Sequence, residues 1–228
     1  MIGAHPDDID FGCAATVAMW VHAGIEVTYL LVTRGDAGGY DDTPRADMPA
    51  LREAEQRAAA KVVGVSDVRF LDGYPDGDVQ AGHALVRDIS RVIRQVRPQR
   101  VLAQSPERNY ERLPASHPDH TASGEAAMRA IYPAARNPFA YPELLTDGLD
   151  PWSVPDIWLM GHPTLNHYVD VTEAVDHKID ALRAHVSQTS HMGDGLDTMI
   201  RGWLGENARI AGLPQGRLAE AYFRTSVA

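Results

Sequence analysis

The tetrapeptide HPDD at positions 5–8 crowds an imidazole and two carboxylates into one short stretch, directly after an apolar segment. Neighbouring carboxylates repel each other and lose hydration when they are buried, so a positive charge is expected among them. Pro6 fixes a turn across which His5 and Asp8, at positions i and i+3, can face one point, whereas Asp7 projects to a different side. The motif therefore predicts that His5 and Asp8 belong to a cation site.

The tetrapeptide HPDH at positions 117–120 supplies further ligands. Its two histidines, His117 and His120, lie one helical turn apart, and Pro118 suits the first turn of a helix. Histidine and carboxylate ligands without sulfur suit a zinc-like ion. Three protein ligands would leave one position open for water, which is the arrangement of catalytic zinc sites.

Each motif also has a purely structural interpretation. Asp7 or Asp8 could cap a helix that begins near Phe11, and HPDH could be a capped helix start. Capping alone explains the two motifs together less well, because both follow strands of the same predicted sheet.

Apolar strand-like runs alternate with helix-like segments over the first half of the chain. The expected strands are 2–4, 27–32, 68–71 and 100–104, and the expected helices are roughly 12–23, 49–63, 82–97 and 119–131. This alternation predicts a doubly wound α/β fold, with a mostly parallel, Rossmann-like sheet flanked by helices. Such folds bind ligands at the carboxyl ends of their strands. The polar clusters 5–8, 33–42, 72–78 and 105–120 each follow a predicted strand.

The second half of the chain is less regular. A proline-rich segment spans 132–155, strand-like runs follow at 157–161 and 167–171, and the C-terminal part, 173–228, is expected to be helical, chiefly over 173–188 and 196–212. His177 and His185 lie eight residues apart on one predicted helix and are interpreted as flanking a buried face. The whole chain, 1–228, is expected to form a single domain.

The bulk composition disfavours some classes of partner. The 228-residue chain has a formal net charge of −10, whereas nucleic acids and anionic membranes bind basic surfaces. No stretch approaches the roughly 20 apolar residues of a membrane span, and no signal peptide is evident, so a cytoplasmic protein is expected. The single cysteine, Cys13, lies in an apolar stretch and is expected in the core. The short first strand suggests that the chain start is incomplete or misassigned.

The motif AHPDD, followed later by HPDH, resembles the PIG-L/LmbE-like family of zinc-dependent N-acetylglucosaminide deacetylases. The resemblance covers most of the chain and includes VTRGDAGG, LREAE, YPDG and DVTEAVDHKIDALRAHVSQ. Many family members have a glutamate where this chain has Asp10, a position to which we assign neither metal binding nor chemistry.

The resemblance implies a role for each matching motif residue. His5, Asp8 and His120 would be the zinc ligands and Asp7 the general base. A protonated His117 would stabilise the oxyanion and protonate the departing amine.

Three further residues are weaker candidates. Arg52 in LREAE would contact substrate, and the alternative is an arginine in a surface ion pair. Asp76 in YPDG would also contact substrate, and the alternative is a turn residue. Asp119 would orient or charge His117, and the alternative is a carboxylate at a helix start.

The expected activity is hydrolysis by metal-activated water of an N-acyl group, most often acetyl, on a small glucosamine-containing sugar conjugate. Alternatives are an amidase for a larger amide, such as a thiol-sugar conjugate, and a non-catalytic metal- or sugar-binding protein. Zinc is the expected cofactor, although Fe²⁺ or Co²⁺ also suits two histidines and an aspartate. The resemblance further implies a homo-oligomer, a trimer or a hexamer.

Overall fold

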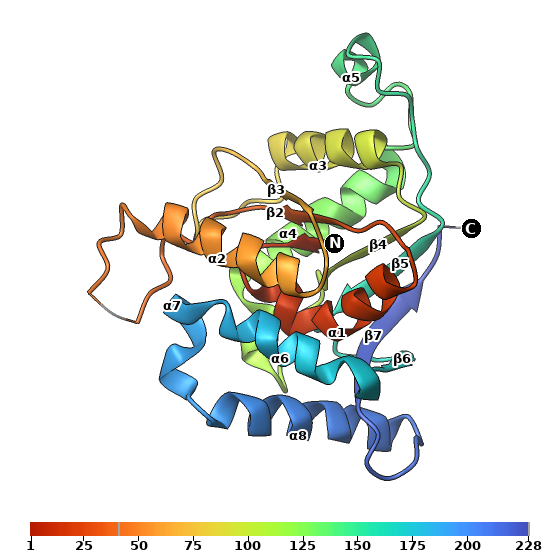
Figure 1. The fold of residues 1–228 in the computed structure, drawn as a ribbon. Helices are drawn as coiled ribbons and strands as arrows, with labels where there is room; N and C mark the ends of the chain where they lie inside the picture. Colours follow the sequence, from red (N-terminus) through yellow and green to blue (C-terminus); the bar gives the residue numbers. More distant parts are fainter. Residues whose placement is uncertain (41, 228) are drawn as a thin grey trace.

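The computed structural model describes residues 1–40 and 42–227, in which a seven-stranded sheet has the order β3-β2-β1-β4-β5-β7-β6 (Figure 1). The strands are β1 (Ile2–Gly3), β2 (Thr28–Leu31), β3 (Asp67–Phe70), β4 (Arg100–Gln104), β5 (Asp156–Met160), β6 (His167–Asp170) and β7 (Ala219–Thr225). Strands β1 to β5 pair in parallel, whereas β7 runs antiparallel to β5 and β6. The predicted α/β sheet is confirmed, and it is mixed at one edge.

Helices cover both faces of the sheet. They are α1 (Asp8–His22), α2 (Met48–Val62), α3 (His83–Val96), α4 (Pro118–Arg129), α5 (Pro142–Thr146), α6 (Val175–Arg183), α7 (Val186–Thr189) and α8 (Gly195–Ile210). Figure 1 shows α3 and α4 on one face and α1, α2 and α6 on the other, with α8 beyond α6. Among the described residues, no helix is both long and apolar enough to cross a membrane.

The prediction that 173–228 is helical is wrong in two places. The expected helix 173–188 ends at Arg183, and α7 begins after His185, so His185 lies between two helices and not on the helix of His177. The last element is a strand, β7, although its alanines and glutamate favour a helix. Pairing with β5 on one side and β6 on the other decides its conformation, because tertiary context overrides weak local propensity.

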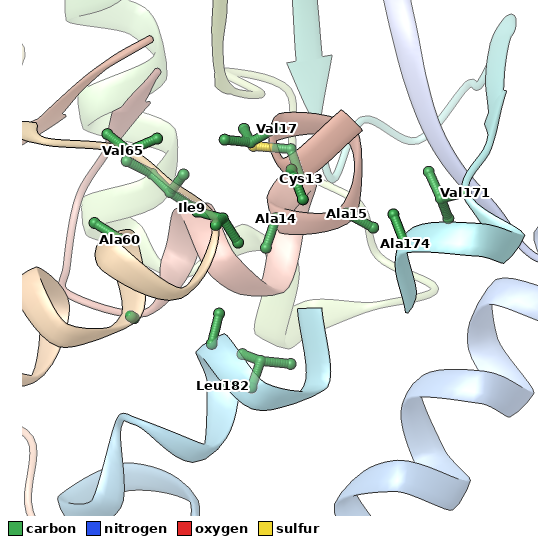
Figure 2. Close-up of a cluster of buried hydrophobic side chains, with 14 of the residues drawn as sticks. Ile9, Cys13, Ala14, Ala15, Val17, Ala60, Val65, Val171, Ala174 and Leu182 are labelled. Atoms are coloured by element: carbon green, nitrogen blue, oxygen red, sulfur yellow. The ribbon is translucent and has the colours of Figure 1, made fainter. Parts of the chain in front are cut away.

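Small side chains let α1 pack closely on its neighbours. Figure 2 shows Cys13 and Ala14 of α1 in a cluster with Ala60 of α2 and Leu182 of α6, and all four are buried. The expectation that Cys13 belongs to the core is therefore confirmed. This packing fixes α1, which begins at one of the predicted metal ligands.

Helix α1 is interrupted at Cys13, where φ and ψ are −151° and 15°. Lys178 donates to two carbonyl oxygens at the end of the first segment, at 3.0 and 2.6 Å, and Glu220 accepts from two backbone N–H groups of the second, at 3.2 and 2.8 Å. The ammonium and the carboxylate lie 2.6 Å apart and are buried. The positive Lys178 lies at the C-terminal end of the first segment, and the negative Glu220 lies at the N-terminal end of the second, as the helix dipoles favour. This ion pair therefore replaces the hydrogen bonds lost at the break.

Replacing Glu220 with alanine should lower the free energy of unfolding by about 3–5 kcal/mol, because the Lys178 ammonium is left buried without its partner. The helix N–H groups also lose their acceptor. Urea denaturation of the two proteins measures the difference. Glu125→Ala, which breaks an exposed pair with Arg129, is the matched control and should change the unfolding midpoint little. Equal midpoints for Glu220→Ala and the control would contradict this account of the break.

Candidate active site

The two histidine motifs meet where the strand order of the sheet reverses. Strands β1 and β4 are neighbours, while β2 and β3 lie on one side of them and β5 on the other. HPDD (5–8) follows the carboxyl end of β1, and HPDH (117–120) begins α4, the next α-helix after β4. The site therefore lies at the crevice in which doubly wound folds bind ligands.

The side chains of the three predicted ligands converge. His5 Nδ1 lies 3.3 Å from Asp8 Oδ2, His120 Nε2 lies 3.0 Å from Asp8 Oδ1, and the two ring nitrogens lie 3.3 Å apart. Ligands at about 2.0–2.1 Å from a zinc ion in a tetrahedron are about 3.3–3.4 Å from one another. The two histidines contact different oxygens of Asp8, so these distances join four atoms. The donor types of His5, Asp8 and His120 and the spacing of the two histidine nitrogens fit a metal ion, and the ring nitrogens of His5, His117 and His120 are also close enough to hold one.

The other ring nitrogen of His5 faces two carboxylates. His5 Nε2 lies 3.1 Å from an oxygen of Asp76 and 3.1 Å from an oxygen of Asp119. Burial lowers the pKa of His5, but its hydrogen bonds with Asp119, Asp76 and Asp8 outweigh burial and raise the pKa to about 12. The surroundings of His5 thus favour positive charge. A carboxylate on Nε2–H also leaves Nδ1 free to bind a metal.

The Asp119 carboxylate contacts a different histidine from the one expected. Its carboxylate contacts His5 and accepts hydrogen bonds from the backbone N–H groups of Gly77 and Val79, at 2.7 and 3.1 Å. Only its backbone reaches His117, by donating from N–H to Nδ1 at 3.2 Å. The Asp119 carboxylate therefore contacts His5 and not His117, whereas its negative charge still raises the pKa of His117, as the second half of the expectation requires.

His117 lies beside the metal-ligand group and caps α4. Its ring centroid is 5.0 Å from that of His5 and 5.3 Å from that of His120. Burial and these two neighbouring histidines lower the pKa of His117. Because Nδ1 accepts the capping hydrogen bond, a neutral ring carries its proton on Nε2. The capping hydrogen bond fits a His117 ring without a proton on Nδ1, and the protonated form expected from the sequence stays a prediction. The capping role of His117 coexists with its place in the site.

Asp7 has an unusual backbone conformation, with φ at 100°. Its carboxylate makes no helix-capping hydrogen bond and lies 3.1 Å from the guanidinium of Arg52. Burial and the charge of Asp8 raise the pKa of Asp7 to about 6, although Arg52 opposes the shift. The capping interpretation of HPDD is therefore wrong for Asp7, and α1 begins at Asp8 rather than near Phe11.

The two predicted substrate contacts have protein partners. Arg52 is 3% exposed, and its guanidinium donates to the carbonyl oxygens of Gly35 and Pro6 as well as to Asp7. Arg52 is therefore not a surface residue. One carboxylate oxygen of Asp76 contacts His5, and the other accepts a hydrogen bond from the N–H of Ala37. That either residue also touches substrate stays a prediction.

Three buried residues near the site were not assigned a role from the sequence. Gln56 on α2 and His185 before α7 both contact Asp10, which lies two residues after the predicted metal ligand Asp8. The signal for Gln56 was its place one helical turn after Arg52, on the same face of α2. His185 is distant in the chain, and only the fold brings it to Asp10.

Comparison with known proteins places the chain in a family. The family model for the PIG-L GlcNAc-PI de-N-acetylases matches residues 1–131. The diacetylchitobiose deacetylase of Thermococcus kodakarensis is 32% identical, with 82% of this chain and 68% of that protein covered. A probable N-acetyl-alpha-D-glucosaminyl L-malate deacetylase 2 of Bacillus cereus is 30% identical, with 86% of each covered.

A solved structure extends the similarity to the three-dimensional fold. The N,N'-diacetylchitobiose deacetylase from Pyrococcus horikoshii superposes with a TM-score of 0.88 at 27% identity, over 99% of this chain and 82% of that one. The matched family model includes both histidine motifs, and the structural match includes the C-terminal part beyond residue 131. The chain belongs to the PIG-L family of de-N-acetylases.

Proposed function

We propose that the protein is a zinc-dependent hydrolase that removes the acetyl group from a small N-acetylglucosaminide. The observation that carries the proposal is the convergence of His5, Asp8 and His120, whose ring nitrogens and two carboxylate oxygens make contacts of 3.0–3.3 Å, beside the carboxylate of Asp7. The family and its deacetylase relatives supply the class of reaction. The related proteins act on different N-acetylglucosamine conjugates, so the group attached to the sugar is left open.

The ligand set suits a metal whose chemistry is to lower the pKa of a bound water and to polarise the amide carbonyl. Asp7 is proposed as the general base. Its carboxylate, which lies next to the proposed ligand Asp8, would take a proton from the attacking water and then release it to the departing amine. The amine needs this proton, because an unprotonated amide nitrogen is a poor leaving group.

His117 is proposed to stabilise the oxyanion. Its capped Nδ1 leaves Nε2–H as the donor, and a donor held by the protein needs no reorganisation as negative charge develops. The predicted transfer of a proton from His117 to the amine requires a doubly protonated ring, which would break the capping hydrogen bond. We therefore assign that transfer to Asp7.

The test is acetate release from N-acetylglucosamine, diacetylchitobiose and N-acetylglucosaminyl malate by protein loaded separately with Zn²⁺, Fe²⁺ or Co²⁺. Release of acetate with zinc, and its loss after chelation, is the expected result. Release only of a larger acyl group from a thiol-sugar conjugate would favour the amidase alternative. Metal binding without turnover of any amide would favour a binding protein. The predicted trimer or hexamer, the single domain and the cytoplasmic location stay predictions.

A further inference from the structure

The peptide bond that joins Pro6 to Asp7 is held at both of its polar groups by α2. Arg52 donates to the Pro6 carbonyl oxygen at 2.5 Å, and the Asp7 N–H donates to Gln56 Oε1 at 2.9 Å. Arg52 and Gln56 are four residues apart, so they lie on the same face of the helix. Both are buried. Residues from two successive turns of α2 thus hold the two polar groups of one trans peptide, which point in opposite directions.

These contacts act on a backbone conformation that residues other than glycine rarely adopt. Asp7 has φ at 100°, inside the left-handed half of backbone space. Such a conformation persists only where surrounding contacts over-determine it. The direction of the Asp7 carboxylate follows from this φ, so the groups that hold the peptide also aim the proposed base.

The side-chain amide of Gln56 has its own orienting partner. Gln56 Nε2 donates to Asp10 Oδ2 at 2.7 Å. A carboxylate only accepts hydrogen bonds, so Asp10 fixes the amide with its nitrogen toward Asp10 and its oxygen toward the Asp7 N–H. If the amide were reversed, it would present a donor to a donor at Asp7.

Asp10 is held in turn by a residue from the C-terminal part of the chain. His185 Nε2 lies 2.9 Å from the same oxygen, Asp10 Oδ2, and both side chains are fully buried. Apolar residues of similar size would fill this space without the loss of hydration that a buried polar pair suffers. Because Asp10 lies between Gln56 and His185, the buried Asp10–His185 pair can fix the position of the Gln56 amide.

We propose that Gln56, Asp10 and His185 are positioning residues for Asp7. The order of contacts is His185 to Asp10, Asp10 to Gln56, and Gln56 to the Asp7 N–H. The inference rests on the proposed function, in which Asp7 is the general base. It extends the active site to His185, which lies outside the segment matched by the family model.

The first measurement compares Gln56→Met and His185→Leu with the wild type for kcat, KM and metal content. We expect kcat to fall about 10–100-fold, as for other residues that orient catalytic groups, while KM stays within about threefold and metal content is unchanged. Gln95→Met and His177→Leu are the matched controls, on α3 and on the exposed side of α6, and should keep wild-type kcat. His185→Gln retains an N–H donor toward Asp10 and should recover part of the loss.

A double-mutant cycle distinguishes an effect on the position of Asp7 from a general loss of fold stability. If Gln56 acts through Asp7, Gln56→Met should reduce the residual turnover of Asp7→Ala little further. An equal fold-loss in both backgrounds would overturn the inference, as would wild-type kcat in Gln56→Met and His185→Leu. If either variant fails to fold, His185→Gln and its cycle with Asp7→Ala decide. A wild-type protein that releases acetate from no substrate would instead refute the proposed function.

Discussion

Replacing Asp7 with alanine is expected to lower kcat for acetate release by about 10²–10⁴-fold, the range that general base catalysis contributes. The metal should stay bound, because the converging donor atoms belong to His5, Asp8 and His120. Steady-state kinetics and elemental analysis of the same preparation measure both quantities. A fall in kcat with about one metal per chain would separate the base from the ligands.

The control for this variant is Asp176→Ala, which removes a largely exposed carboxylate on α6 that pairs with Arg201. It should keep wild-type kcat and metal content. Retained turnover in Asp7→Ala would refute the assignment of the base. Loss of metal together with turnover would show that Asp7 acts as a ligand, and the roles of Asp7 and Asp8 would need to be exchanged.

Replacing His120 with alanine is expected to remove both metal and activity. His120 supplies one of the three donor atoms, and the remaining two cannot enclose the ion from the α4 side. The measurement is metal stoichiometry for protein purified without added metal, and again after incubation with zinc and desalting. We expect about one metal per chain in the wild type and much less in the variant.

His117→Ala is the matched comparison, because both histidines belong to HPDH and lie at the start of α4. It should keep the metal and lose kcat, since His117 is proposed to act on the oxyanion. Loss of metal in His117→Ala would make His117 a ligand, which the spacing of its ring nitrogens from those of His5 and His120 also permits. A wild type that binds no metal even after zinc is supplied would refute the proposed function.

The two candidate motifs could be brought to one place from the sequence because both follow strands of the same predicted sheet. The order of strands and helices places 5–8 and 117–120 at one edge of the sheet, and the family resemblance then implies His5, Asp8 and His120 as the ligands. Their convergence in the structure depends on the fold and on little else. The predicted bounds of the parallel strands β1 to β4 are close to the observed ones, because each strand is an apolar run in the sequence.

The orientation of side chains within the site could not be predicted in this way. Asp119 is next to His120 in the chain, yet its carboxylate turns toward His5 and toward the backbone of residues 77 and 79. Arg52 is predicted from the sequence to contact substrate, with a surface ion pair as the alternative, but its burial against the Pro6–Asp7 peptide could not be predicted. Each outcome depends on contacts between distant segments, which local spacing does not encode.

The contact of His185 with Asp10 shows the same limit at longer range. The two residues are 175 positions apart, and the break between α6 and α7 turns His185 toward α1. A continuous helix over 173–188 would place His185 on the face of His177 or close to it. The break was not expected from the sequence, so a residue that the structure places behind the active site was interpreted as part of an ordinary buried face.

The interrupted helix α1 also makes the geometry around Asp8 depend on a distant part of the chain. Asp8 lies in the first segment of α1, whereas Lys178 and Glu220, which bridge the break, come from α6 and β7. Without these two side chains, the helix ends at the break would lack partners. Strand β7 therefore supports the loop of the candidate ligands from its place between β5 and β6, although it contributes no candidate ligand itself.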